Sequence, residues 1–176
     1  MTDEAARRRF EAVAMPYLDD AYRLARWLTR SAADAEDVVQ DAFLRAFAAI
    51  GGYAGGNPRA WILTIVRRTA YSWMAKNRPA LLVVTDDLEA IERAQADPGE
   101  SWGATPETLL IAAQDGERLS RAIEALSPPF REALVLRDVQ GLSYREIAEV
   151  MEIPIGTVMS RLARARGLLA KALGEG

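Results

Sequence analysis

Apolar residues recur every three or four positions over most of this chain, the spacing that places side chains on one face of an α-helix. Two such stretches lie on either side of Pro16, where proline should interrupt the helix. Others run from Asp34 to Ile50 and from Arg59 to about Asn77. Between them, residues 51–58 hold four glycines and a proline, which predicts a loop. The pattern therefore predicts an all-α protein.

The periodicity fades between residues 80 and 116, where prolines and glycines recur. We expect this acidic stretch to be a flexible linker, with short helical turns around Leu88–Ala94 and Glu107–Gln114. It would separate two small helical domains, at residues 1–79 and 117–176. A chain of 176 residues is long enough to bury two such cores.

The segment 141–166 has the pattern of two short helices joined by a tight turn. Ser143 is a good N-cap, and Glu146 follows at the spacing of a capping box. Pro154 cannot lie inside a helix, so the first helix should end between Met151 and Ile153. This is the pattern of a helix–turn–helix.

The second of these helices should start around Gly156 or Thr157 and carry two different stripes. The apolar stripe, which we expect to face inward, consists of Val158, Leu162, Ala165 and Leu169. The polar stripe consists of Thr157, Ser160, Arg161 and Arg164. Hydroxyl and guanidinium groups arranged in this way suit a recognition helix in the major groove. An ordinary helical hairpin with a solvated basic face would show the same spacing.

The predicted helix from Arg59 to Asn77 interleaves aromatic residues with cations. Its candidate contact residues are Arg67, Arg68, Tyr71, Trp73, Lys76 and Arg78, whereas we expect Trp61 in the core. Rings that stack on bases and guanidinium groups that hold the backbone suit single-stranded nucleic acid. The alternative is that both tryptophans are core, and for Tyr71 and Trp73 the two interpretations remain open.

Acidic and amide side chains share one face of the preceding helix, at Asp37, Gln40 and Asp41. Carboxylates near a helix start interact favourably with the helix dipole, which alone could explain them. The same face would also suit a protein partner.

The chain contains no cysteine and no histidine, which excludes disulfides and removes the commonest general base and metal ligand. We therefore expect neither catalysis nor a cofactor, and a cytoplasmic location. No apolar run approaches the roughly 20 residues that span a bilayer, so we expect no direct membrane insertion.

The net charge of −3 alone would disfavour binding to nucleic acid, but the charges are segregated. Residues 59–79 and 157–172 carry bases and no acids, whereas residues 85–117 carry nine acids and one base. Local potential decides contact with phosphate, so both basic regions remain candidates.

Four segments resemble, in order, a bacterial sigma factor of the extracytoplasmic-function (ECF) type. They are Asp34–Phe47 (DAEDVVQDAFLRAF), Arg59–Tyr71 (RAWILTIVRRTAY), Leu126–Leu134 (LSPPFREAL) and Gly141–Arg166. The resemblance covers nearly the whole chain apart from its ends and the connector. It implies a region-2-like domain at residues 1–79 and a region-4-like domain at residues 117–176.

The resemblance also implies binding to core RNA polymerase, through its β and β′ subunits, and to promoter DNA, with an anti-sigma factor as a further partner. The residues implied in core binding are Asp37, Gln40 and Asp41. Those implied at the −10 element are Asn57, Arg59, Arg67, Arg68, Tyr71, Trp73, Lys76 and Arg78. Those implied at the −35 element are Arg145, Thr157, Ser160, Arg161, Arg164 and Arg166.

Three positions depart from the pattern of many relatives. Arg68 stands in place of an asparagine, and Met159 in place of a basic residue. Both departures bear on which promoter sequence the protein recognises. Glu152 takes a turn position often filled by glycine, which should strain the turn slightly.

Two other classes of protein remain as alternatives. A helix–turn–helix regulator with an N-terminal sensing or dimerisation domain would bind duplex operators without polymerase. A small carboxylate-dependent enzyme would need acids that converge on an apolar pocket, but here they cluster at a helix start and in the connector.

Overall fold

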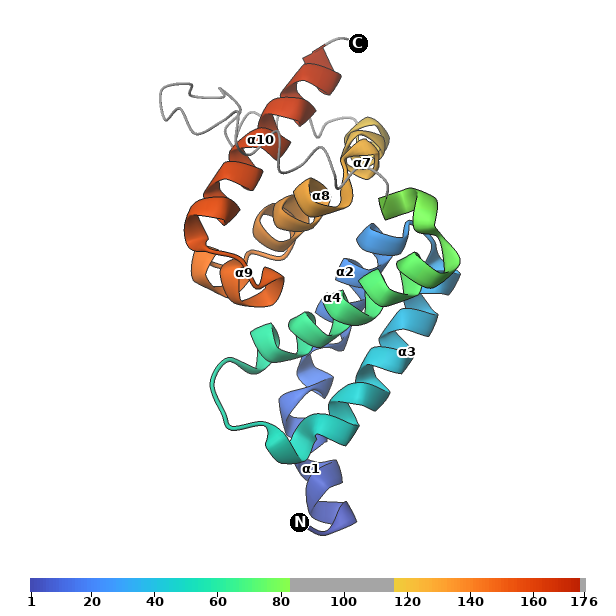
Figure 1. The fold of residues 1–176 in the computed structure, drawn as a ribbon, viewed down its shortest axis with the longest axis vertical. Helices are drawn as coiled ribbons and strands as arrows, with labels where there is room; N and C mark the ends of the chain where they lie inside the picture. Colours follow the sequence, from blue (N-terminus) through green and yellow to red (C-terminus); the bar gives the residue numbers. More distant parts are fainter. Residues whose placement is uncertain (83–115, 175–176) are drawn as a thin grey trace. The chain divides into compact units, whose positions relative to one another are not determined.

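The computed structural model of the chain describes residues 1–82 and 116–174, and every regular element in these ranges is helical (Figure 1). The predicted all-α class is therefore confirmed. The helices form two compact units, the first built on Met1–Arg78 and the second on the helices that follow residue 115. The turns expected around Leu88–Ala94 and Glu107–Gln114 lie outside the described residues.

The first unit is built from four α-helices and short 3₁₀ turns. In chain order they are α1 (Asp3–Val13), η1 (Met15–Tyr17), α2 (Leu18–Thr29), α3 (Ala32–Ala49), η2 (Ile50–Gly52) and α4 (Pro58–Asn77). The short turn η3 (Pro79–Leu82) follows directly after this unit. Helices α2, α3 and α4 contact one another, and α1 contacts α3 and η2. Pro16 lies in η1, so the first stretch breaks there as predicted.

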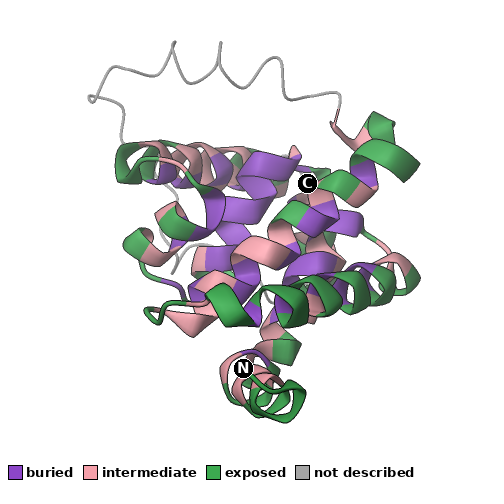
Figure 2. Cartoon of the chain, turned by 60° about the horizontal axis from the view of Figure 1, so that its bottom comes forward, coloured by how far each residue is buried: buried purple, intermediate pink, exposed green. Residues whose placement is uncertain are grey.

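The apolar faces of α2, α3 and α4 meet in a shared core. Its buried side chains include Leu24, Leu28, Val38, Ala42, Leu63 and Val66. Figure 2 shows buried residues in bands along the helices, with exposed residues on their other sides. Burying one leucine or valine side chain contributes about 1.5–3 kcal/mol, so this packing stabilises helices that would be marginal alone.

Side-chain caps determine where two of these helices begin. The Asp34 amide donates to the Ser31 hydroxyl (3.3 Å), and α3 starts directly after Ser31, slightly before the predicted Asp34. The Ala60 amide donates to Asn57 Oδ1 (3.1 Å), with Pro58 in the first helical position of α4. Each cap pairs an amide that has no partner inside the helix.

The second unit contains α7 (Gly116–Ala125), α8 (Pro128–Leu134), a π-helical turn η4 (Val135–Val139), α9 (Tyr144–Met151) and α10 (Ile155–Gly174). Helix α10 packs against α7 and α8. The stripe expected to face inward is confirmed as buried, namely Val158, Leu162, Ala165 and Leu169. Over the described ranges, no helix combines the length and apolar character needed to cross a bilayer.

The helix–turn–helix has the predicted local structure. The Glu146 amide donates to the Ser143 hydroxyl (3.1 Å), and the Ser143 amide donates to Glu146 Oε1 (3.2 Å), so the capping box is confirmed. The first helix ends at Met151 as expected, and the second begins at Ile155, directly after Pro154 and just before the predicted start.

Candidate nucleic-acid and polymerase interface

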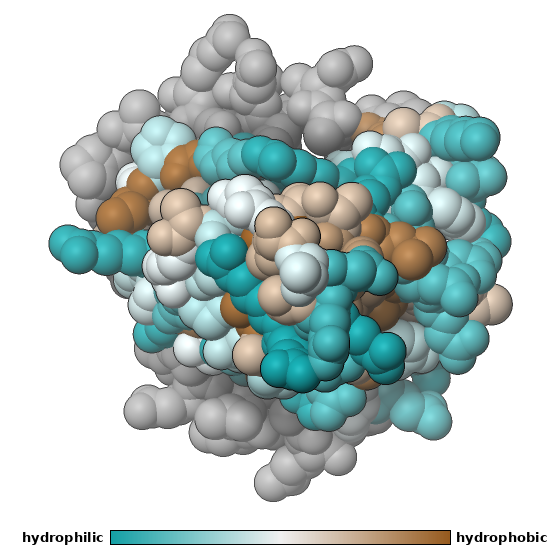
Figure 3. Space-filling view, turned by 90° about the horizontal axis from the view of Figure 1, so that it is seen from below, coloured by the Kyte–Doolittle hydropathy of each residue, from teal (hydrophilic) through white to brown (hydrophobic). Residues whose placement is uncertain are grey.

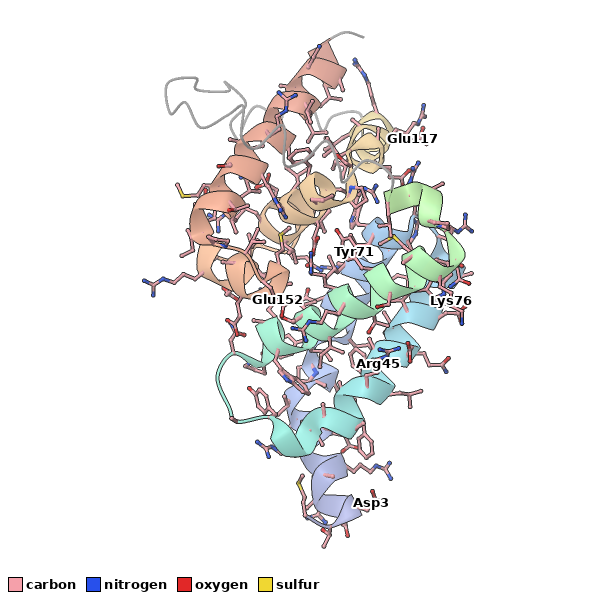
Figure 4. All side chains as sticks on the ribbon, viewed as in Figure 1. Asp3, Arg45, Tyr71, Lys76, Glu117 and Glu152 are labelled. Carbon is pink, nitrogen blue, oxygen red and sulfur yellow. The ribbon has the colours of Figure 1, made fainter. Side chains whose placement is uncertain are left out.

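Asp37, Gln40 and Asp41 all lie exposed on one face of α3. Asp41 forms an ion pair with Arg45 one turn further on (3.1 Å; Arg45 is labelled in Figure 4). Leu44 lies on the same face and is 66 % exposed. The face therefore combines carboxylates with one exposed apolar side chain.

A groove of about 420 Å³ runs beside this face, between the η1–α2 region and α3. Its apolar lining is formed by Met15, Leu18, Tyr22, Val39 and Phe43, and its polar lining by Asp19, Glu36 and Gln40. Figure 3 shows apolar patches set among hydrophilic residues on the side that it displays. Within the described ranges, no group of acidic residues converges in a way that could hold a metal ion.

Helix α4 presents the aromatic and cationic side chains that the sequence singles out. The guanidinium carbon of Arg67 lies 4.8 Å from the ring centroid of Tyr71, one turn along the helix, in a cation–π contact. Tyr71 and Trp73 are half-buried, whereas Lys76 is exposed (Tyr71 and Lys76 are labelled in Figure 4). Arg68 is exposed as well. Aromatic rings and cations thus lie side by side along α4.

Three other residues predicted at the −10 element have structural contacts inside the first unit. Arg59 Nε lies 2.8 Å from Asp20 Oδ2, with both side chains less than a quarter exposed. Arg78 pairs with Asp34 at 3.2 Å, and Asn57 caps α4. The two ion pairs fix α4 against α2 and α3, and the cap fixes the start of α4 itself. A role of these three residues in DNA contact stays a prediction.

The glycine-rich loop between η2 and α4 is held by a tyrosine that the sequence analysis did not single out. The Tyr53 ring lies 4.9 Å from that of Trp61, tilted by 49°, and its hydroxyl donates to the Gly56 carbonyl (3.2 Å). Gly55 and Gly56 both have φ near +95°, a conformation that side chains rarely adopt. Trp61, expected in the core, is half-buried against this loop.

The outer side of α10 carries the candidate residues of the second unit. Ser160 is exposed, with Thr157 and Arg161 half-buried nearby on the same helix. The Ser160 hydroxyl donates to the Gly156 carbonyl (3.0 Å), so it stays close to the helix backbone. Arg164 is half-buried, and Arg145 is exposed on α9.

Arg166 is held from inside the second unit. It forms a two-pronged ion pair with Asp138, with nitrogen–oxygen distances of 2.8 and 3.2 Å. The hydrogen bond that Arg166 donates to the Asp138 carboxylate raises the pKa of Arg166 above its ordinary value, although burial acts in the opposite direction. Next to it, Arg137 lies over the Tyr144 ring (4.8 Å) and donates to the Leu142 carbonyl (2.8 Å). These contacts connect η4, α9 and α10.

Comparisons with known families match both units. Residues 13–79 match the Sigma-70 region 2 model, and residues 116–169 match the Sigma-70, region 4 model. The ECF RNA polymerase sigma-E factor of Escherichia coli K12 is 38 % identical over 141 residues, which cover 76 % of this chain and 70 % of that protein. The chain belongs to the ECF sigma factors.

A second relative matches almost the whole length of this chain. The ECF RNA polymerase sigma factor SigE of Mycolicibacterium smegmatis is 30 % identical over 174 residues, covering 98 % of this chain and 65 % of that protein. The match of both regions, in the expected order, favours a sigma factor over a regulator that binds duplex operators alone.

Solved structures agree with this fold. The sigma factor RpoE of Bartonella quintana, in complex with the anti-sigma factor NepR, matches with a TM-score of 0.67 and 30 % identity, over 94 % of this chain and 96 % of that one. CnrH, in complex with the cytosolic domain of CnrY, matches with a TM-score of 0.65 at 23 % identity, over 98 % of this chain and 94 % of that one.

The structure of this ECF sigma factor brings some of the predicted residues together and adds others. It groups Asp37, Gln40 and Asp41 on one face, and Arg67 with Tyr71. Sequence reasoning missed Leu44 and Tyr53. Helical spacing could have found Leu44, which follows Gln40 and Asp41 on the same face.

Proposed function

We propose that this sigma factor docks on core RNA polymerase through α3, recognises and opens the −10 element with the glycine-rich loop and α4, and contacts the −35 element with α10. It would act by binding alone, without catalysis. The observation that carries the proposal is that an acidic helix face and a cation–aromatic helix face lie on packed neighbours, α3 and α4, in the unit that matches region 2.

Docking to polymerase would use the exposed face formed by Asp37, Gln40 and Asp41. Its carboxylates suit a basic partner surface, and the exposed Leu44 supplies an apolar contact one turn after Gln40 and Asp41. We propose that this face binds the clamp helices of the polymerase β′ subunit, and that other parts of the chain contact the β subunit.

Opening of the −10 element would use α4 and the loop before it. Taking a base out of the duplex costs a few kcal/mol, and one base stacked on an aromatic ring returns about 1–3 kcal/mol. Tyr71 and Trp73 offer such rings, and Arg67, Arg68 and Lys76 offer cations for the backbone. In this proposal Asn57, Arg59 and Arg78 act mainly by holding α4 in place, because each already has a structural contact.

Contact with the −35 element would use the exposed start of α10. Thr157, Ser160 and Arg161 would face base edges, and Arg145 and Arg164 would hold phosphates. Arg166 would position α10, because Asp138 already pairs with its guanidinium group. An anti-sigma factor is a further expected partner, since the related RpoE was solved in complex with one.

The test is run-off transcription with purified core polymerase, with and without this protein, on a library of promoter fragments. Specific transcripts that require the protein would support the proposal. Tight duplex binding by the protein alone, with no transcript, would instead favour an operator-binding regulator.

Asp37→Arg tests the docking face. It should weaken core binding about tenfold or more, because it replaces an attractive charge with a repulsive one. Asp3→Arg, at the exposed start of α1, is the charge-matched control and should leave core binding unchanged. Equal affinities for Asp37→Arg and the wild type would rule out this face.

A further inference from the structure

Helix α1 has no role in the proposed function, yet one of its arginines reaches the glycine-rich loop. Arg7 and Arg8 pair with Glu11 and Glu4 on their own helix, and both arginine side chains are 76 % exposed. Arg9 is half-buried and instead donates a hydrogen bond to the carbonyl of Tyr53, 44 positions away in the chain. Three consecutive arginines therefore divide into two solvated ones and one that holds the loop.

Arg9 contacts Tyr53 in two ways. Besides the hydrogen bond to the carbonyl, its guanidinium carbon lies 5.6 Å from the centroid of the Tyr53 ring, within the range of a cation–π contact. The other contacts of Tyr53 extend this support, because its ring lies on Trp61 and its hydroxyl reaches the Gly56 carbonyl. Contacts through Arg9, Tyr53 and Trp61 thus connect α1, the loop and the start of α4.

A loop of this composition requires such support. Glycines lose more backbone entropy on ordering than any other residue, and Gly55 and Gly56 adopt a conformation that only glycine takes easily. If the loop were mobile in the free protein, each binding event would have to order it, and affinity would fall accordingly.

We infer that Arg9 is a positioning residue for promoter opening. It holds the glycine-rich loop, through Tyr53, in the shape that accepts a base displaced from the −10 element. The inference rests on the proposed role of this loop. It adds a residue of α1 to those that act on the −10 element, although the proposed function gives α1 no role.

The first arm of the test measures the loop in the free protein by amide hydrogen exchange. The Tyr53 amide donates to the Ile50 carbonyl (3.2 Å), so its protection reports on the loop. Arg9→Ala should raise its exchange rate about tenfold, equivalent to about 1.4 kcal/mol. Arg8→Ala is the matched control, one position away on the same helix, and should leave the rate unchanged. Equal protection in Arg9→Ala and the wild type would overturn the inference.

The second arm measures promoter opening by holoenzyme, using a fluorescent base analogue in the −10 element, at saturating protein. Arg9→Ala should slow opening about tenfold and reduce the preference for the native −10 base over a substituted one, while core affinity stays at the wild-type value. Arg9→Lys, which keeps the charge and a nitrogen that can donate to the Tyr53 carbonyl, should restore part of the rate. A general loss of folding would lower core affinity instead.

A third variant separates failure of the inference from failure of the proposed loop function. Gly55→Ala strains the loop directly, because its φ is +96°. If Gly55→Ala slows opening and Arg9→Ala does not, the inference is overturned and the loop keeps its proposed role. If neither variant affects opening although Arg9→Ala loosens the loop, the proposed role of the loop is overturned, and with it the inference.

Discussion

The arginines of this sigma factor form two kinds of ion pair, between distant residues and within a single helix. Arg59, Arg78 and Arg166 each pair with a carboxylate of the same unit that is distant in sequence. Arg45 and Arg121 pair only one turn along their own helices. Ion pairs between distant, partly buried residues fix helices against one another, whereas exposed pairs within a helix contribute little.

Asp138→Asn tests this distinction in the second unit. Arg166 and Asp138 are 14 % and 23 % exposed, so the variant leaves a largely buried guanidinium group without its carboxylate. We expect the free energy of unfolding to fall by about 1–2 kcal/mol, measured by urea denaturation followed by circular dichroism. Glu117→Gln removes an exposed pair with Arg121 and should change stability by less than about 0.5 kcal/mol. Equal effects of the two substitutions would contradict the distinction.

The same pair has a defined pH dependence. The folded-state pKa of Arg166 is raised, so its contribution to stability is fully present below the unfolded-state pKa and is lost only as pH rises through the folded value. Arginine titrates at strongly alkaline pH. The stability difference between the wild type and Asp138→Asn should therefore be the same at about pH 7 and about pH 9.

At the scale of elements, the turn between α9 and α10 places a glutamate in a backbone conformation that favours glycine. Glu152 has a φ of 58°, in the left-handed region, and the Ile153 amide donates to the Ala148 carbonyl (3.1 Å). This is a Schellman motif, whose left-handed position is usually glycine. The strain expected from the sequence is thus visible in the backbone.

Glu152→Gly should stabilise the protein by about 0.5 kcal/mol, because relief of the left-handed conformation exceeds the added entropy of glycine in the unfolded chain. Glu149→Gly is the matched control, a glutamate in the interior of α9, and should destabilise it by about 1 kcal/mol. Thermal unfolding of both variants gives the comparison. Destabilisation by both would show that the turn is unstrained.

Local features of this fold could be predicted from sequence, and distant ones could not. Helical spacing, Pro154 and the Ser143 capping box located the helix–turn–helix because each acts within a few residues. The pairs Arg166–Asp138 and Arg9–Tyr53 join positions 28 and 44 residues apart, and only tertiary packing brings them together. Composition also gave no signal for the π-helical turn η4.

At the scale of the whole molecule, a protein of net charge −3 must bind DNA through local positive surfaces. The sequence places nine acids between two regions that carry only bases. Each cation that contacts a phosphate releases condensed counterions from the DNA, so affinity falls as salt rises.

Lys76→Gln should lower the slope of log affinity against log salt by about 0.7–0.9 for holoenzyme on promoter DNA, the effect of one lost phosphate contact. It should weaken binding similarly on different promoter sequences. Arg8→Gln removes a comparable exposed charge from α1 and should leave the slope unchanged. An unaltered slope for Lys76→Gln would remove this residue from the interface.

In the π-helical turn η4, the number of residues matters as much as the identity of their side chains. In it, the Gln140 amide donates to the Val135 carbonyl, five positions back (2.9 Å), so the turn holds one residue more than an α-helix would. Deleting one residue of the turn would restore the α-helical count, so the residue removed decides where Asp138 lies. Deleting Val135, which is fully buried, would rotate Asp138 by about 100° relative to α8. Such a deletion would weaken the link between η4 and α10 although both charged residues stay in the chain.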